Sequence, residues 1–130
     1  MKAVYVDTSA LGRVLLDEPD RQAIQRDLAK FGQHVASRLL RVELRRVGLR
    51  RGLLDRASAL IADISLIPID DRILDSTETL APATVGTLDA IHLATAVGLL
   101  EEGRLDALMT YDKQLAIGAR EHGLEVLTPS

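Results

Sequence analysis

The sequence predicts an α/β fold: a single domain with a central parallel sheet of about four to five short strands and helices on both faces. Short apolar runs rich in branched residues alternate with longer segments of helical spacing along the 130 residues. Strands that alternate with helices pair in parallel, because each connection has to cross the sheet. The length suits one domain and no repeat, linker or low-complexity tract divides it, so we assign residues 1–130 to a single unit.

Composition limits the kinds of protein that this chain can be. Hydrophobic residues make up 47% of the sequence but aromatic residues only 2%, so the core must consist of Leu, Ile, Val and Ala. The chain has no Cys, which excludes a disulfide framework and a thiolate metal site and fits a reducing cytoplasm. No apolar run approaches the roughly 18 residues of a membrane span, and MKAVYVD meets an acid too early for a signal peptide. We therefore expect a cytoplasmic protein.

The elements of the first third follow from local patterns. Residues 3–6, AVYV, form a short apolar run that is typical of a buried strand. The hydroxyl residues of DTS can cap a helix over residues 8–16, which DEPD interrupts. A proline and early acids open a second helix at residues 19–30, and residues 34–37 form a second short strand. Residues 39–51 have helical spacing and end before a glycine, so we expect a third helix.

The middle of the chain contains two further helices and a strand. Residues 53–64 continue the helical spacing directly after the glycine. Residues 66–69 form a third short apolar run, which we interpret as a strand. Pro68 cannot donate a ladder hydrogen bond, so this strand should lie at an edge of the sheet. Residues 73–80 again have helical spacing.

The last third alternates in the same way. Residues 87–100 form a strongly apolar helix, with Thr87 as the expected N-cap and EEG as its end. Residues 107–110, ALMT, form the fourth strand. A helix over residues 113–122 stops at a glycine, and the branched pair at residues 126–127 indicates a last strand.

Two aspartates follow apolar strands directly. Asp7 comes after residues 3–6, and Asp112 comes after residues 107–110. In an open parallel sheet, binding sites form outside the carboxyl ends of the strands. The alternative is that each aspartate only caps the helix that follows, which is a common position for Asp. Two strands that end in the same way favour a shared site over two unrelated caps.

Glu43 lies on the apolar side of its expected helix. Its neighbours at helical spacing are Leu39, Leu40 and Val47, while the arginines of this segment occupy other faces. Burying a carboxylate is costly unless it is paired or bound to a metal. The alternative to a metal is an ion pair with a nearby arginine.

Asp89 stands in the first turn of a helix that is apolar on nearly every side. The helix dipole stabilises an anion at this position, which is the purely structural explanation. The first turn of a buried helix beside the carboxyl edge of the sheet is also a position from which a carboxylate can bind a ligand. His92, one turn further on, is expected to be packed in the core, with orientation of the Asp89 carboxylate as the alternative.

Four carboxylates at one place would repel one another strongly without a counter-charge. Mg²⁺ and Mn²⁺ prefer oxygen ligands, and no cluster of Cys or His competes for this role. Such a site suits metal-assisted cleavage of a phosphodiester bond. We therefore expect the metal ligands to be Asp7, Asp89 and Asp112, with Glu43 as a further ligand or as the residue that holds the attacking water.

The segments that carry these acids resemble the PIN-domain family, and specifically the VapC-type toxins of prokaryotic toxin–antitoxin pairs. VYVDTSAL is similar to the opening strand of the family with its first acid, Asp7, and RLLRVELRR to the segment with the second, Glu43. TLDAIHLATA is similar to the helix that carries the third, Asp89, and LMTYDKQLA to the strand end with the fourth, Asp112. The order and approximate spacing of the acids and the overall length agree, so the resemblance spans essentially the whole chain.

The resemblance implies a PIN-like nuclease whose acids bind Mg²⁺ or Mn²⁺ and hydrolyse RNA. It implies supporting roles for hydroxyl groups beside the first and fourth acids, which here are Thr8, Ser9 and Thr110. It also implies a homodimer and a cognate antitoxin protein that occupies the cleft. Apolar residues of the segment 53–64 could supply the dimer interface.

Arginines are concentrated on one segment although the whole chain has a net charge of −3. Between residues 38 and 56, seven arginines face only two acidic residues, and these arginines are Arg38, Arg41, Arg45, Arg46, Arg50, Arg51 and Arg56. A solvated helix face is the simple explanation. Because all seven are Arg and none is Lys, contact with RNA phosphates is the alternative, since the guanidinium group matches phosphate geometry.

Two other functions remain open from the sequence. The chain could be a catalytically silent binding module with the same fold, although clustered acids give a pure binder no advantage. It could also be a phosphomonoesterase that uses the same acidic site. The hypothesis that we carry forward is a metal-dependent endoribonuclease acting as the toxin of a toxin–antitoxin pair.

Overall fold

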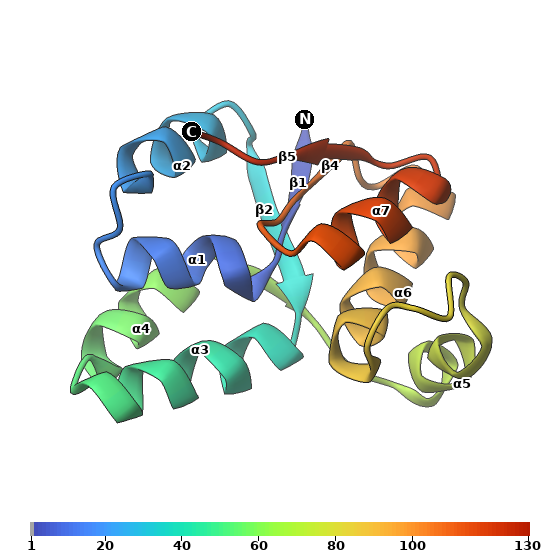
Figure 1. Cartoon of the computed structure of the whole chain (residues 1–130), viewed down its shortest axis with the longest axis horizontal. Coiled ribbons are helices and arrows are strands. Elements are labelled where there is room, and N and C mark those ends of the chain that lie inside the picture. Colours follow the sequence, from blue (N-terminus) through green and yellow to red (C-terminus); the bar gives the residue numbers. More distant parts are fainter. Residues whose placement is uncertain (1) are drawn as a thin grey trace.

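The first strand of this protein lies in the middle of one parallel sheet (Figure 1). The computed structural model describes residues 2–130. Within these residues the sheet has the order β3-β2-β1-β4-β5, and its strands are β1 (Ala3–Val6), β2 (Gln33–Ser37), β3 (Ser65–Ile67), β4 (Ala107–Met109) and β5 (Glu125–Leu127). All four pairings are parallel, which confirms the predicted fold class.

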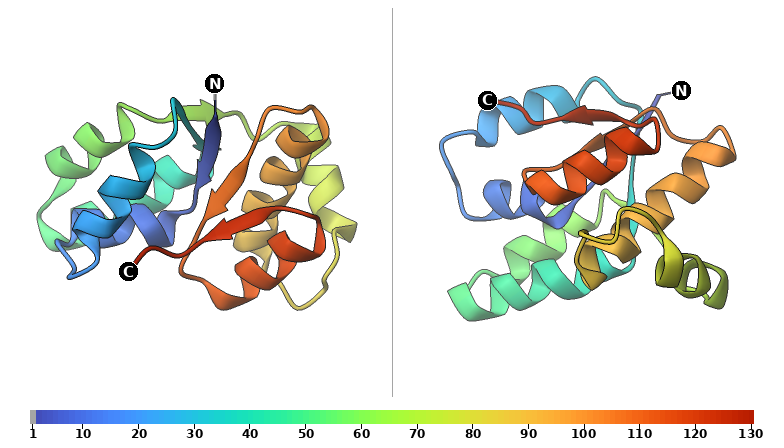
Figure 2. Two further views of the ribbon diagram at one scale, coloured as in Figure 1. Left: turned by 90° about the horizontal axis from the view of Figure 1, so that it is seen from above. Right: turned by 45° about the vertical axis from the view of Figure 1, so that its right-hand side comes forward.

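Helices cover both faces of the sheet. In the part of the chain that the structure describes they are α1 (Thr8–Leu15), α2 (Arg21–Leu28), α3 (Leu39–Arg51), α4 (Leu54–Ile61), α5 (Asp71–Thr79), α6 (Thr87–Glu101) and α7 (Lys113–Glu121). Figures 1 and 2 show α1 to α4 on one side of the sheet and α5 to α7 on the other. The chain runs outward from β1 to β3 and returns across the sheet to β4, so the direction of winding reverses between β1 and β4. Right-handed crossovers place the two groups of helices on opposite faces for this reason.

Aliphatic side chains from both layers form the core, as the composition predicts. The largest fully buried ones are Leu15, Ile24, Leu40, Leu44, Leu93, Leu108, Met109 and Leu115. Tyr5 and His92 are equally buried and are the largest side chains with polar atoms in this core. None of the helices over residues 2–130 combines the length and apolar character needed to cross a lipid bilayer.

Two expected helix caps are wrong by one or two residues. The N-cap of α1 is Asp7 rather than Thr8 or Ser9, and the N-cap of α6 is Gly86 rather than Thr87. In both cases the cap has an extended backbone and the hydroxyl residue already lies inside the helix. Asp7 therefore lies both at the end of a strand and at the start of a helix, which its side chain caps.

Other boundaries differ where a turn or an edge shortens an element. The helix expected from residue 19 begins at Arg21, because Pro19 and the residue after it form a turn. The strand β3 pairs only with β2, which confirms its edge position, and it ends just before Pro68. Ala57 and Ile61 of α4 are buried inside the domain, so most of the apolar side of segment 53–64 serves the core rather than a dimer interface.

Gly48 marks the place where α3 packs closely against α4. A Cβ atom added there would lie 3.0 Å from the Cβ atom of Ala57 and 3.0 Å from the carbonyl oxygen of Leu53. Because backbone cannot easily give way, we expect Gly48→Val to lower the free energy of unfolding by about 2–3 kcal/mol. Gly98 is a matched helical control with no atom within 4 Å of an added Cβ. Urea denaturation should show a change of less than about 0.5 kcal/mol for Gly98→Val, and equal losses in the two variants would contradict this close packing.

Candidate active site at the carboxyl edge of the sheet

Asp7 lies at the point where β1 leaves the sheet beside β4. Its backbone N–H donates to the carbonyl oxygen of Met109 over 3.0 Å, which extends the pairing of Val6 with Met109. The residue is only 3% exposed although it carries a carboxylate. The reversal in winding thus brings the residues that follow β1 and β4 together, as expected for an open α/β sheet.

Two hydroxyl groups, one from the first turn of α1 and one from the residue after β4, hold one oxygen of Asp7. Ser9 Oγ donates to Asp7 Oδ2 over 2.7 Å, and Thr110 Oγ1 donates to the same oxygen over 2.8 Å. The backbone N–H of Ser9 approaches it at 3.4 Å, which is the capping contact. Asp7 is therefore a helix cap and also a member of a polar cluster, so the two explanations from the sequence are not exclusive. The expected contact of Ser9 and Thr110 with an acid is present in the structure.

Asp112 repeats this arrangement after β4. It is the N-cap of α7, and its side chain accepts a hydrogen bond from the backbone N–H of Leu115 over 2.8 Å. The backbone N–H of Asp112 donates to Thr110 Oγ1 over 3.0 Å. Thr110 is therefore a direct link between the carboxylate of Asp7 and the backbone of Asp112.

Asp89 reaches the same edge from the first turn of α6. Burial, and after it the nearby carboxylates of Asp112 and Asp7, raise its pKa to about 6, while His92 acts in the opposite direction. The structure thus brings three of the four expected acids within electrostatic reach of one another, and their mutual repulsion falls on Asp89.

Glu43 faces this group from α3 on the other side of the sheet edge. Its Oε1 accepts a hydrogen bond from Thr8 Oγ1 over 2.7 Å and another from His92 Nε2 over 2.7 Å. Burial acts to raise the pKa of Glu43, but the hydrogen bonds from His92 and Thr8 outweigh burial and lower it. The suggestion that an arginine would pair with Glu43 is wrong, because the partner is His92.

Sequence reasoning missed the polar contacts of His92 and Tyr5. His92 has no exposed surface, as expected of a packed residue, but it is also hydrogen-bonded at both ring nitrogens. Its Nε2 lies 3.8 Å from Asp7 Oδ1 in addition to its bond with Glu43, and its Nδ1 lies 2.6 Å from Tyr5 Oη. These contacts orient Glu43 rather than Asp89, the carboxylate that the sequence suggested. The available signal was a histidine in the middle of a helix whose other central residues are mostly apolar.

The donor set fits a hard divalent cation. All the expected ligands are carboxylate oxygens, the ligands that such a cation prefers, and burial together with the carboxylates of Asp112 and Asp7 raises the pKa of Asp89. Over residues 2–130, no three His, Asp or Glu side chains lie close enough together to hold a metal ion between them. Mg²⁺ commonly takes only one or two carboxylates and keeps several waters.

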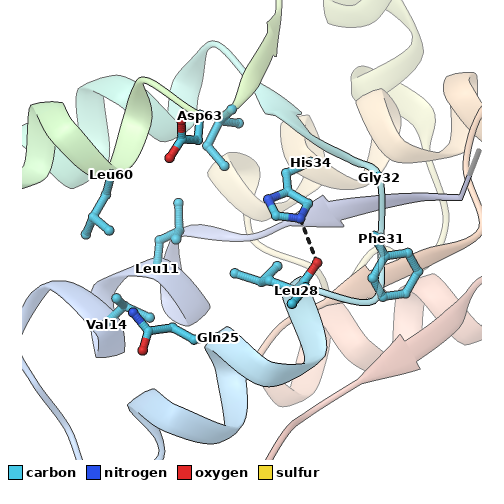
Figure 3. A pocket seen from close by; sticks show the side chains of 11 residues that line it. Leu11, Val14, Gln25, Leu28, Phe31, Gly32, His34, Leu60 and Asp63 are labelled. Carbon is cyan, nitrogen blue, oxygen red and sulfur yellow. Dashed lines mark hydrogen bonds between the residues drawn. The ribbon is translucent and has the colours of Figure 1, made fainter.

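A shallow groove between α1 and α3 adjoins these acids. It has a volume of about 290 Å³ and is lined by Thr8, Ser9, Gly12, Arg13, Leu16, Glu18 and Val47. A separate cavity of about 410 Å³ lies between α1, α2 and α4, where Leu11, Leu28 and Phe31 contribute to its lining (Figure 3). None of the four acids lines either hollow. The groove reaches the acids through Thr8 and Ser9, which line it and hydrogen-bond to Glu43 and Asp7.

The arginine cluster lies along α3 and the start of α4. Six of its seven members are exposed, and Arg45 is half-buried and donates to Ser58 Oγ. In the described part of the chain none of the seven forms an ion pair with an acid. Their charges are consequently available to solvent or to a polyanion, and the structure leaves both explanations standing.

Comparisons with known proteins agree with this geometry. The profile of the PIN domain matches residues 4–127. The chain is 39% identical to ribonuclease VapC47 of Mycobacterium tuberculosis over 97% of this chain and 96% of that protein. It is 38% identical to ribonuclease VapC46 of the same species over the full length of both. Among solved structures, a toxin–antitoxin complex from Klebsiella pneumoniae contains a chain with the same fold, with a TM-score of 0.75 and 22% identity over 98% of both chains.

Proposed function

This chain belongs to the PIN-domain family, and we propose that it is a metal-dependent endoribonuclease, the toxin of a toxin–antitoxin pair. The observation that carries the proposal is the convergence of Asp7, Asp89 and Asp112 at one edge of the sheet, with Glu43 held beside them. The full-length similarity to two proteins named as VapC ribonucleases supports it. We further propose that the protein acts in the cytoplasm, because its proposed substrate is RNA.

Asp7, Asp89 and Asp112 would hold the cation. When bound, Mg²⁺ or Mn²⁺ neutralises charge on the phosphodiester group and makes water a better nucleophile. The protein prepares for this ion by fixing Asp7 Oδ2 with two hydroxyl groups, which leaves Oδ1 as the oxygen with no hydroxyl partner. Thr8, Ser9 and Thr110 therefore support the site by orienting carboxylates rather than by reacting.

Glu43 would bind the attacking water or the cation. Its lowered pKa keeps it ionised at neutral pH, so it can accept a hydrogen bond from a water molecule. Thr8 and His92 both donate to Oε1, so Oε2 is the oxygen that can face a ligand. The groove between α1 and α3 starts at Thr8 and offers room for the RNA strand next to this residue.

The experiment that tests the nuclease is cleavage of total cellular RNA by the purified protein. We expect discrete fragments with Mg²⁺ or Mn²⁺ and none with EDTA, because the acids alone cannot neutralise the phosphate. A nucleoside monophosphate tested in parallel should stay intact. Release of phosphate from it without RNA cleavage would favour a phosphomonoesterase, and no reaction of any kind, with no Mn²⁺ binding, would favour a silent binding module.

The exposed arginines of α3 would contact RNA phosphates near the acids. We expect Arg46→Gln with Arg50→Gln to weaken RNA binding and to reduce the slope of log Kd against log salt by about 1.4, or about 0.7 for each phosphate of a single strand. Binding can be measured by fluorescence anisotropy in EDTA, which prevents cleavage. Arg104→Gln with Arg120→Gln removes the same charge from exposed positions elsewhere and should leave the slope unchanged. Equal slopes in both double variants would show that the arginine cluster faces solvent and does not contact RNA phosphates.

We also propose two protein partners. The similarity to a chain from a toxin–antitoxin complex and to VapC ribonucleases supports a cognate antitoxin that covers the cleft. A homodimer is the second proposal, and it requires a surface other than the buried side of α4. Light scattering of the purified chain, alone and with the antitoxin, tests both.

A further inference from the structure

A chain of buried hydrogen bonds connects the middle of the sheet with Glu43. Tyr5 on β1 and His92 on α6 have no exposed surface. Tyr5 Oη lies 2.6 Å from His92 Nδ1, and His92 Nε2 lies 2.7 Å from Glu43 Oε1. Most of the core is aliphatic, and a buried polar group costs free energy unless it is hydrogen-bonded. Packing alone therefore does not require these two side chains at the centre of the domain.

The donors and acceptors give this chain a direction. The backbone N–H of Ser37 can only donate, so the oxygen of Tyr5 accepts from it over 2.9 Å. The single proton of the phenol then points to His92 Nδ1, which accepts it. An imidazole that accepts at Nδ1 carries its proton on Nε2, the atom that faces Glu43. Each group therefore donates to the next, from the backbone of β2 to the carboxylate.

The chain of hydrogen bonds ends at one oxygen of the Glu43 carboxylate, Oε1, and does not involve the other oxygen, Oε2. Thr8 Oγ1, from α1, donates to the same Oε1 over 2.7 Å, so two donors on different helices determine how the carboxylate is rotated. Across residues 2–130 no protein hydrogen bond uses Oε2, and this atom is not among the buried atoms without a partner. Oε2 is thus the accessible oxygen whose direction Tyr5, His92 and Thr8 determine together.

We propose that Tyr5 and His92 are positioning residues of this nuclease: Tyr5 selects the Nε2–H form of His92, and His92 holds the Glu43 carboxylate in the orientation that the reaction needs. The inference rests on the proposed function and goes beyond it in assigning a role to two residues that touch neither the RNA nor a metal. Outer groups that orient ligands and bases commonly affect activity by about 10–100-fold.

The first variant for the test is Tyr5→Phe, which removes one hydroxyl group and keeps the ring. We expect kcat to fall by about 10-fold, while KM for RNA changes by less than about twofold because the groove and the arginines are intact. In a Glu43→Gln background the same substitution should change kcat by less than about twofold, since it acts through the carboxylate. A purely structural role for Tyr5 would give equal losses in both backgrounds.

A spectroscopic measurement on the metal-free protein tests the chain of hydrogen bonds without an activity assay. The ¹⁵N signals of the imidazole nitrogens should place the proton of His92 on Nε2, and in Tyr5→Phe both protonated forms should become populated. The chain has three histidines, and His34→Gln and His122→Gln identify the other two signals. These two variants lose hydrogen bonds to the carbonyl oxygens of Leu28 and Ala81 and should retain the wild-type kcat.

The outcomes separate the inference from the proposed function. A proton on Nδ1 of His92 in the folded wild type, or an unchanged kcat in folded Tyr5→Phe, would overturn the positioning role. If Tyr5→Phe does not fold, His92→Gln and His92→Leu replace it, and the glutamine, which keeps an N–H donor for Glu43, should retain the higher kcat. A wild type that cleaves no RNA contradicts the nuclease, while the ¹⁵N measurement still decides whether the directed chain exists.

Discussion

Replacing Asp7 with asparagine should abolish RNA cleavage, with a fall in kcat of at least about 1,000-fold, which corresponds to about 4 kcal/mol. The variant keeps the shape of the side chain, and its amide oxygen can still accept the hydrogen bonds that Ser9 and Thr110 donate to Oδ2. What it loses is the negative charge at the centre of the proposed site. The fold should therefore survive while the attraction for a divalent cation does not.

Asp106 provides the matched control for this experiment. Its Oδ2 accepts a hydrogen bond from the backbone N–H of Ala3 over 2.8 Å, at the opposite end of β1 from Asp7. Asp106→Asn keeps an oxygen that can accept this bond, so it should keep kcat within about twofold and change stability by less than about 1 kcal/mol. For both variants, cleavage of a defined RNA in Mn²⁺ measures the activity, and calorimetric titration with Mn²⁺ measures the binding of the metal. A fully active Asp7→Asn protein would move the reaction away from this edge of the sheet.

Asp89→Asn should have two opposite effects, the loss of cleavage and the stabilisation of the metal-free protein at neutral pH. Burial and the carboxylates of Asp112 and Asp7 raise the pKa of Asp89 from its ordinary value of 3.8 to about 6. Folding at pH 7.5 therefore places an anion where it is unfavourable. Because the side chain is partly solvated, screening reduces the effect, and we expect the amide to add about 1 kcal/mol of stability.

The sign of the pH dependence follows from linkage. Between about pH 4 and 6 the folded protein retains a proton on Asp89 that the unfolded chain has already released. This contribution to stability is complete below the unfolded pKa and is lost as the pH rises through about 6. Urea denaturation in EDTA should thus show Asp89→Asn more stable than wild type at neutral pH and equal to it near pH 4. Asp75→Asn, at an exposed position of α5, should have the stability of the wild type throughout this pH range. The same gain in stability for Asp75→Asn would show that it comes from the change in net charge of the protein and not from the surroundings of Asp89.

Much of the fold could be predicted from the sequence because each element carries its own signal. The apolar run AVYV, the proline after β3 and the glycine after α3 each fix one local feature, and the structure confirms all three. The cap of α1 was misplaced because DTS contains three residues that can cap a helix, and only the backbone angles of the folded chain select Asp7.

The candidate site was predictable in position but not in its connections. Acids that follow two strands have to meet when those strands are neighbours, and β1 and β4 are neighbours. The partner of Glu43 was not predictable, because His92 and Thr8 reach it from helices that are distant in the sequence. No spacing rule relates residues on three different elements, so such hydrogen bonds emerge only from the packed structure. The catalytic roles of the four acids stay predictions.

If the chain is the toxin proposed above, the strand order also determines when it can become active during its synthesis. A nascent chain that has been synthesised as far as α6 contains Asp7, Glu43 and Asp89, but it lacks β4, which is the neighbour of β1 in the finished sheet. It also lacks Thr110 and Asp112, so one of the two hydroxyl groups that hold Asp7 Oδ2 is missing. Unfinished and prematurely terminated products should therefore be harmless, and toxicity should begin only once β4 has emerged from the ribosome and docked.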